Sequence, residues 1–153
     1  VDAQNRGGSY DLALAELRSG RKRTHWIWWV FPQLAALGRS GNARFYGIVD
    51  AAEAADYLRH PLLGARFLDA LRAVHQHVCG RAADLENLMG SHVDALKLVS
   101  SLTLFAHVAA HVAADAPASA AIRQLATEVL DAARQRGWSP CHATLQVIGQ
   151  SER

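Results

Sequence analysis

Apolar side chains recur every three or four residues along most of this chain, which predicts amphipathic helices rather than strands. The clearest stripe consists of Phe67, Leu71, Val74 and Val78. Together with start and stop residues, the pattern predicts long helices over Ser9 to Gly20, Asp50 to His60, Pro61 to Gly80, Ser91 to Val112 and Asp115 to Gly137. The segment 25–31 fits a strand or a short helix, because Pro32 interrupts it, and we favour the short helix.

Three polar residues mark the expected helix starts. Asp50 and Ser91 each precede an acidic residue three positions later, the spacing of a capping box, and Ser9 is a candidate N-cap of the first long helix. Pro61 suits the first turn of a helix, where its missing N–H has no intrahelical partner. No comparable signal assigns a structure to the tail that follows Trp138.

The composition agrees with a helical fold. Alanine is more frequent than valine, isoleucine and threonine together, and half of the residues are hydrophobic while 20% are charged. We expect an all-α single domain of about six to seven irregularly packed helices, which spans residues 1–153 and has a short tail at 139–153. The chain begins at Val1 without Met, so we expect a few native N-terminal residues to be missing.

Charge and cysteine content exclude several classes of protein. A net charge of +2 is too small to indicate a nucleic-acid or membrane-surface protein, so we expect neither partner. Cys79 and Cys141 form no metal knuckle or disulfide framework, which favours a reducing cytoplasmic compartment. The sequence shows no basic-then-apolar leader, and Pro32 breaks the longest apolar run well short of the ~20 residues that a membrane span needs.

The sequence carries none of the common catalytic or cofactor signatures. Gly-x-Ser-x-Gly, the Walker loop and Gly-x-Gly-x-x-Gly are absent, so we assign no catalytic residue and no cofactor. His107 and His111 have the i, i+4 spacing of two metal ligands on one helix, but no third ligand accompanies them. We therefore predict no metal site.

The most distinctive segment is the basic-aromatic motif, residues 21–29, in which three cations run directly into three tryptophans. Cationic donors beside aromatic faces are what a site needs to bind a phosphate and to stack a base. The competing interpretation is structural: charge runs after a helix are usually solvated, and clustered tryptophans are more often core. A buried indole N–H still requires a polar partner, so either interpretation predicts a polar network here.

A second concentration of polar groups lies in the apolar helix expected at 91–112. Lys97, Ser100 and Ser101 fall within about two helical turns there. Serine and threonine in such a helix either bond back to a carbonyl four residues earlier or face a ligand, and both interpretations stay open.

Four segments resemble a bacterial family described only as a domain of unknown function, number 1810, some of whose members carry the name calpastatin. The matching segments are 21–34, 38–48, 54–58 together with 60–64, and 97–105. The family pattern usually has methionine at the positions of Ile27 and Leu102. The resemblance implies an all-helical domain of irregularly stacked helices and gives no activity, substrate or cofactor. The calpastatin name conflicts with the patterned core, because an inhibitor of that type is disordered.

Two hypotheses of function follow. The first is a domain, enzymatic or not, that binds a small anionic or nucleotide-like ligand, such as a phosphorylated metabolite, between segment 22–33 and helix 97–105. The candidate ligand-binding residues are Lys22, His25, Trp26, Trp28, Gln33, Tyr46, Lys97, Ser100 and Ser101. The alternative is a non-catalytic protein–protein interaction module, whose tryptophans form its core or an exposed patch. The oligomeric state stays undefined.

Overall fold

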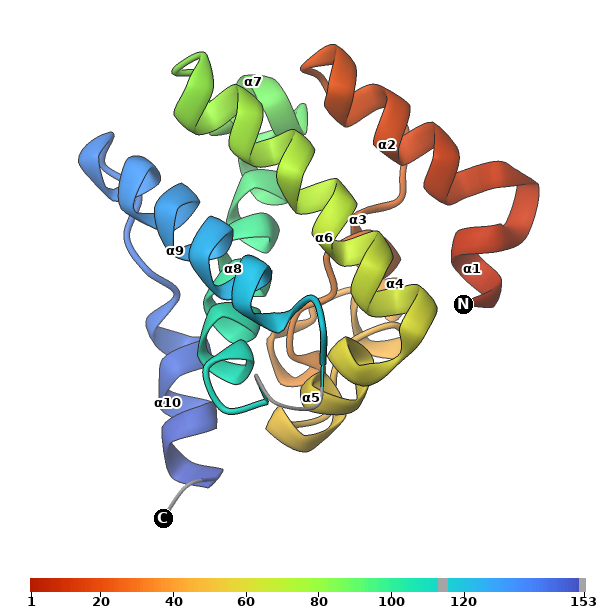
Figure 1. Ribbon diagram of the computed structural model, residues 1–153, viewed down its shortest axis with the longest axis vertical. Helices are drawn as coiled ribbons and strands as arrows, with labels where there is room; N and C mark the ends of the chain where they lie inside the picture. Colours follow the sequence, from red (N-terminus) through yellow and green to blue (C-terminus); the bar gives the residue numbers. More distant parts are fainter. Residues whose placement is uncertain (113–115, 152–153) are drawn as a thin grey trace.

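The computed structural model describes residues 1–112 and 116–151, and it confirms the all-α fold (Figure 1). The α-helices are α1 (Asp2–Asn5), α2 (Ser9–Ser19), α3 (Ile27–Val30), α4 (Gly41–Phe45), α5 (Ala51–Arg59), α6 (Pro61–His75), α7 (Leu85–Met89), α8 (His92–Ala109), α9 (Ser119–Gln135) and α10 (His142–Ser151). Within the described residues, six of these helices have nine residues or more, in line with the expected six to seven. None of the described helices is both long and apolar enough to cross a membrane.

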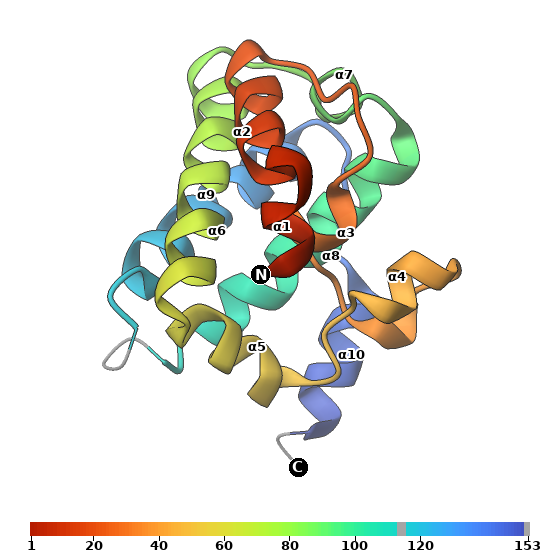
Figure 2. The same cartoon turned by 90° about the vertical axis from the view of Figure 1, so that its right-hand side faces the viewer.

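Helix α8 is the centre of the packing. It contacts α3, α5, α7, α9 and α10, while α6 lies across α9 and also contacts α2 and α5 (Figures 1 and 2). Aromatic rings fill the space between α5, α6 and α8: the ring centroids of Phe67 and Phe105 lie 4.5 Å apart, and those of Tyr57 and Phe105 lie 5.3 Å apart. Because neighbours surround α8, its serines and Thr103 are buried together with its apolar residues.

Several predicted helix boundaries agree with the structure. The Asp50 side chain caps α5 by accepting a hydrogen bond from Glu53 N, and Ser91 caps α8 by accepting one from Asp94 N. Pro61 begins α6, and segment 25–31 contains the short helix α3. These features depend on neighbouring residues alone, which is why the sequence was sufficient to predict them.

Other boundaries differ from the prediction. Gly8, not Ser9, is the N-cap of α2, since the Ser9 hydroxyl accepts a hydrogen bond from Trp29 Nε1 at 2.9 Å. Helix α8 ends at Ala109 rather than Val112. Helix α9 begins at Ser119, and the predicted start at Asp115 lies outside the described residues. Gly80 closes a π-helical turn, Gln76–Gly80, that extends α6.

Residues 34–48 leave the helical body as a closed loop, which carries α4 and a 3₁₀ turn at Ala35–Leu37 (Figure 2). Two backbone hydrogen bonds tie its ends together: Ala35 N donates to Ile48 O, and Ile48 N donates to Gln33 O, both at 2.8 Å. Such compact loops with adjoining ends are frequently functional. We call this segment the closed loop.

Replacement of Gly47 by alanine is expected to destabilise the protein by about 2 kcal/mol, because overpacking at a backbone contact forces the chain apart. A Cβ atom at Gly47 would lie 2.5 Å from Ala35 Cα and 2.7 Å from Ala43 O. Gly41→Ala is the matched control, since a Cβ atom there would have no neighbour within 4 Å. Urea unfolding measures the stability of both variants, and equal midpoints would contradict the close contact of Gly47 with Ala35 and Ala43.

Candidate functional site

The basic-aromatic motif is tied to α2 by one carboxylate. Glu16 Oε2 accepts a hydrogen bond from Trp26 Nε1 at 2.6 Å, and Glu16 Oε1 accepts from Thr24 N at 2.9 Å and Thr24 Oγ1 at 2.8 Å. Burial alone would raise the pKa of Glu16, but the hydrogen bonds from Trp26 and Thr24 outweigh it and lower that pKa. Glu16 is therefore held as a carboxylate inside the fold.

Lys22 is a buried structural cation. Its ammonium group lies 2.8 Å from Asp94 Oδ2, donates to Thr24 O at 2.5 Å and sits 5.0 Å from the centroid of the Trp26 ring. The Lys22 side chain is only 5% exposed, and Trp26 is buried as well. Both residues join α2, the motif and α8, so we leave them out of the ligand site.

Three further candidates lie apart from the cavity described below. His25 is exposed and is not among the residues that line this cavity with Lys97. The Tyr46 ring packs edge-on against Trp29, 5.1 Å away, and lines a separate cavity with Gln4 and Trp29. Ser101 is fully buried in α8, and its hydroxyl has no hydrogen-bond partner among the described residues.

Gln33, Lys97 and Ser100 come together around a cavity of about 470 Å³ between the closed loop and α8. The residues that line it are Gln33, Leu37, Arg39, Ser40, Ala43, Val93, Leu96, Lys97 and Ser100. Two of these side chains are cations, and the described lining contains no Asp or Glu. We call this hollow the cationic cavity.

Trp28 supports the Lys97 wall of the cationic cavity. Lys97 Nζ lies 5.3 Å from the centroid of the Trp28 ring, and its distance to Asp94 Oδ1 is 3.8 Å. The carboxylate of Asp94 lies closer to Lys22 than to Lys97. The Lys97 charge is therefore held over an aromatic face and only loosely neutralised, which leaves it able to attract an anion.

Sequence reasoning missed Arg39 and Ser40 as lining residues. Arg39 stands alone between Gly38 and Ser40, outside the basic-aromatic motif, so no local pattern marks it. Ser40 is the N-cap of α4, and its hydroxyl accepts a hydrogen bond from Ala43 N at 3.1 Å. The position of both residues depends on the backbone pairing that closes the loop, which no local pattern shows.

The thiol of Cys141 adjoins the cationic cavity through Ser100. Cys141 Sγ accepts hydrogen bonds from Ser100 Oγ at 3.2 Å and Thr144 Oγ1 at 3.1 Å. Burial opposes its ionisation, but these bonds and those from the backbone N–H groups of Ala143 and Thr144 hold the pKa of Cys141 below its usual value. Burial and the Glu128 charge instead raise the pKa of Cys79.

Iodoacetamide is therefore expected to alkylate Cys141 faster than the more exposed Cys79 near pH 7, because the thiolate is the nucleophile. Mass spectrometry of Cys79→Ala and Cys141→Ala, each of which keeps one thiol, gives the two rates separately. Ser100→Ala should slow the reaction of Cys141. A faster reaction of Cys79 would show that these hydrogen bonds do not favour ionisation of Cys141.

His107 and His111 do adjoin each other on α8 and the turn that follows. Their ring centroids lie 5.0 Å apart, and His111 Nδ1 lies 3.0 Å from the carbonyl oxygen of His107. In the part of the chain that the structure describes, no group of three or more His, Cys, Asp or Glu side chains is placed to hold a metal ion.

The fold and the cationic cavity define an all-α protein with a hollow of small-molecule size. The chain belongs to the family described as "Protein of unknown function (DUF1810)", which matches residues 1–132. It is similar to the conserved hypothetical protein Rv1873 from Mycobacterium tuberculosis, whose crystal structure was determined at 1.38 Å. The two sequences are 36% identical, and the match covers 96% of this chain and 91% of that one with a TM-score of 0.78. No curated protein matches this chain.

Proposed function

We propose that this protein binds a small anionic, nucleotide-like ligand in the cationic cavity. The observation that carries the proposal is the charge of the lining, which contains Arg39 and Lys97 and, among the described residues, no Asp or Glu. Volumes of several hundred Å³ are typical of small-molecule sites, and a few placed polar groups among apolar walls are usual there.

The lining residues divide by chemistry into two parts. Arg39 supplies a fork of N–H donors and Lys97 a point charge, which together suit the oxygens of a phosphate group. Leu37 and Leu96 provide apolar walls for a planar or aliphatic part of the ligand, and the Gln33 amide offers both a donor and an acceptor. A phosphate monoester with a ring system, such as a mononucleotide, satisfies both parts.

We place the protein in the cytoplasm, in agreement with its two free cysteines, Cys79 and Cys141. The proposal assigns binding and no covalent step.

The alternative, a protein–protein interaction module, draws support from two exposed apolar side chains. Phe45, in α4, is 80% exposed and Val49, just after the closed loop, is 71% exposed. Neither residue lines the cationic cavity. The variant Phe45→Ser with Val49→Ser therefore separates the two functions, since it removes this apolar surface and leaves the cavity intact.

Thermal unfolding in the presence of AMP, inorganic phosphate or adenosine tests the proposal. AMP at 100 times its dissociation constant should stabilise the protein by about 2.7 kcal/mol, and adenosine should have a smaller effect because it lacks the charge. The Phe45→Ser, Val49→Ser variant should respond to AMP as the parent protein does. No shift with AMP or phosphate, together with capture of a defined partner that this variant abolishes, would favour the interaction module.

A further inference from the structure

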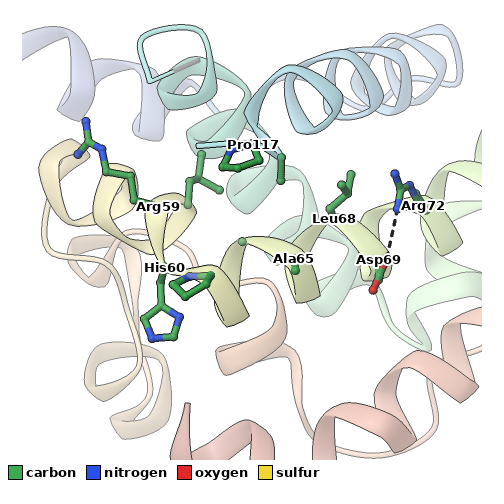
Figure 3. A pocket seen from close by; sticks show the side chains of 11 residues that line it. Arg59, His60, Ala65, Leu68, Asp69, Arg72 and Pro117 are labelled. Carbon is green, nitrogen blue, oxygen red and sulfur yellow. Dashed lines mark hydrogen bonds and ion pairs between the residues drawn. The ribbon is translucent and has the colours of Figure 1, made fainter. Parts of the chain in front are cut away.

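A hollow of about 540 Å³ lies along α6, lined by the end of α5, the first half of α6 and residues 117–118 (Figure 3). Its two arginines are both paired with carboxylates. Arg72 Nη1 lies 3.3 Å from Asp69 Oδ1, and Arg59 Nη1 lies 3.2 Å from Asp56 Oδ1. The charge of this hollow therefore selects no class of ligand.

A smaller cavity, of about 250 Å³, has a more distinctive lining and shares no residue with the cationic cavity. Three aromatic side chains reach it from three elements: Trp29 from α3, Tyr46 from the closed loop and Tyr57 from α5. Gln4 of α1 lines it as well, and the described lining contains no Lys or Arg. We call it the aromatic cavity.

The three rings are held in place by the fold. The Trp29 and Tyr46 rings meet at 65° with their centroids 5.1 Å apart, so they form adjoining walls. Trp29 Nε1 donates a hydrogen bond to Ser9 Oγ at 2.9 Å. The ring of Phe105 packs against Tyr57 in the core, 5.3 Å away between centroids. A site whose walls are already in place loses little entropy when a ligand binds.

The amide of Gln4 is fully engaged within the fold. Its Nε2 atom donates to Trp29 O at 2.7 Å and to the Tyr57 hydroxyl at 3.2 Å. Its Oε1 atom accepts from Arg66 Nη1 at 3.2 Å. Arg66 lies over the Tyr10 ring, 4.9 Å from its centroid, and does not line the cavity. The aromatic cavity therefore offers an anion neither the Gln4 donors nor a basic side chain.

The charge of the aromatic cavity is small. Asp2 is its one charged side chain among the described lining residues, and it is exposed. Val1, with its α-amino group, also lines the cavity, so we assign no net charge to this edge. Attraction for a ligand must come from the rings, whose faces carry the negative part of a quadrupole and attract a cation.

We propose that the aromatic cavity binds a small organic cation with a trimethylammonium head group, which lies against the rings of Trp29, Tyr46 and Tyr57. Quaternary ammonium groups suit aromatic walls because they have no N–H that needs an acceptor, and their methyl groups pack on apolar surface. The site is independent of the proposed function in the cationic cavity.

Isothermal titration calorimetry with choline tests the proposal. Choline should bind saturably, whereas 3,3-dimethylbutan-1-ol, which has the same shape with carbon in place of the charged nitrogen, should bind at least about tenfold more weakly. Absence of saturable choline binding would overturn the proposal. Equal affinity for the two compounds would also overturn it, because the cavity would then recognise shape and apolar surface alone.

Substitutions at Tyr46 locate the choline. Tyr46→Leu keeps an apolar wall but removes the ring, so it should weaken choline binding at least about threefold and change the affinity for the neutral alcohol less than about twofold. Tyr46→Phe keeps the ring and should bind choline as the parent protein does. Phe45→Leu is the matched control, since Phe45 is 80% exposed and does not line the cavity. Equal effects of Tyr46→Leu and Phe45→Leu on choline binding would place the cation elsewhere.

AMP serves as a competitor that keeps the two sites distinct. Saturating AMP should leave the affinity for choline unchanged, because the two cavities share no lining residue. Competition between them would overturn the aromatic cavity as a separate site, whereas failure of AMP to bind would affect only the cationic cavity.

Discussion

Replacement of Glu16 by alanine is expected to lower the free energy of unfolding by about 3 to 4 kcal/mol, because charged hydrogen bonds are lost and a buried donor is left without an acceptor. Trp26 is 1% exposed, so its indole N–H cannot turn to water once the carboxylate is gone. The Thr24 N–H and hydroxyl lose the same acceptor. Urea unfolding of the variant measures the loss.

Asp11→Ala is the matched control for this variant. Asp11 is an exposed carboxylate on the same helix, and its removal should change stability by no more than about 0.5 kcal/mol. If Glu16→Ala were as stable as Asp11→Ala, the basic-aromatic motif would not depend on α2 for its structure.

The contribution of Glu16 to the free energy of unfolding should also depend on pH. Its pKa is lower in the folded protein than its ordinary value of 4.5, so this stabilisation is fully present above pH 4.5 and is lost as the pH falls through the lowered folded value. Glu16→Gln does not titrate. The stability difference between the parent protein and Glu16→Gln should therefore shrink as the solution is acidified below about pH 4.5.

Replacement of Lys22 by methionine should cost about 3 kcal/mol of stability, because it leaves the Asp94 carboxylate without its nearest cation. The side chain of Asp94 is only 18% exposed, and Lys97 is 3.8 Å away from it. Addition of Asp94→Asn to Lys22→Met should recover part of the loss, since it removes the unpaired charge. Denaturant unfolding of the parent protein, Lys22→Met, Asp94→Asn and the double variant gives the four stabilities of a double-mutant cycle.

Arg23→Met is the control for the Lys22 variant, because Arg23 is its exposed neighbour in the motif. It should leave stability nearly unchanged. A Lys22→Met protein that kept full stability but lost anion binding would return Lys22 to the ligand site and contradict the structural role.

The sequence was sufficient for the fold class and for helix boundaries set by adjacent residues. The caps at Asp50 and Ser91 and the start at Pro61 each depend on a few neighbouring positions. The helices α1, α4, α7 and α10 were not predicted. The central place of α8 was also missed, because a one-sided apolar stripe does not show that neighbours cover the other side too.

The candidate site was only partly predictable for a different reason. A basic-aromatic segment has the same composition whether its cation meets a ligand or a buried carboxylate. What distinguishes the two in Lys22 is Asp94, which α8 brings within 2.8 Å from a distant part of the chain. Gln33, Lys97 and Ser100 do meet at one cavity, but Arg39 joins them only because the closed loop folds back at Ile48.

Anion binding in the cationic cavity is tested directly by the affinity for AMP of two double variants, measured by calorimetry. Arg39→Gln with Lys97→Gln removes the charge of the cationic cavity, and Arg21→Gln with Arg23→Gln removes the same charge from the exposed part of the basic-aromatic motif. We expect a loss of at least about tenfold for the first variant and less than about twofold for the second. The reverse order would contradict it, and would place the anion site in the motif rather than between the closed loop and α8.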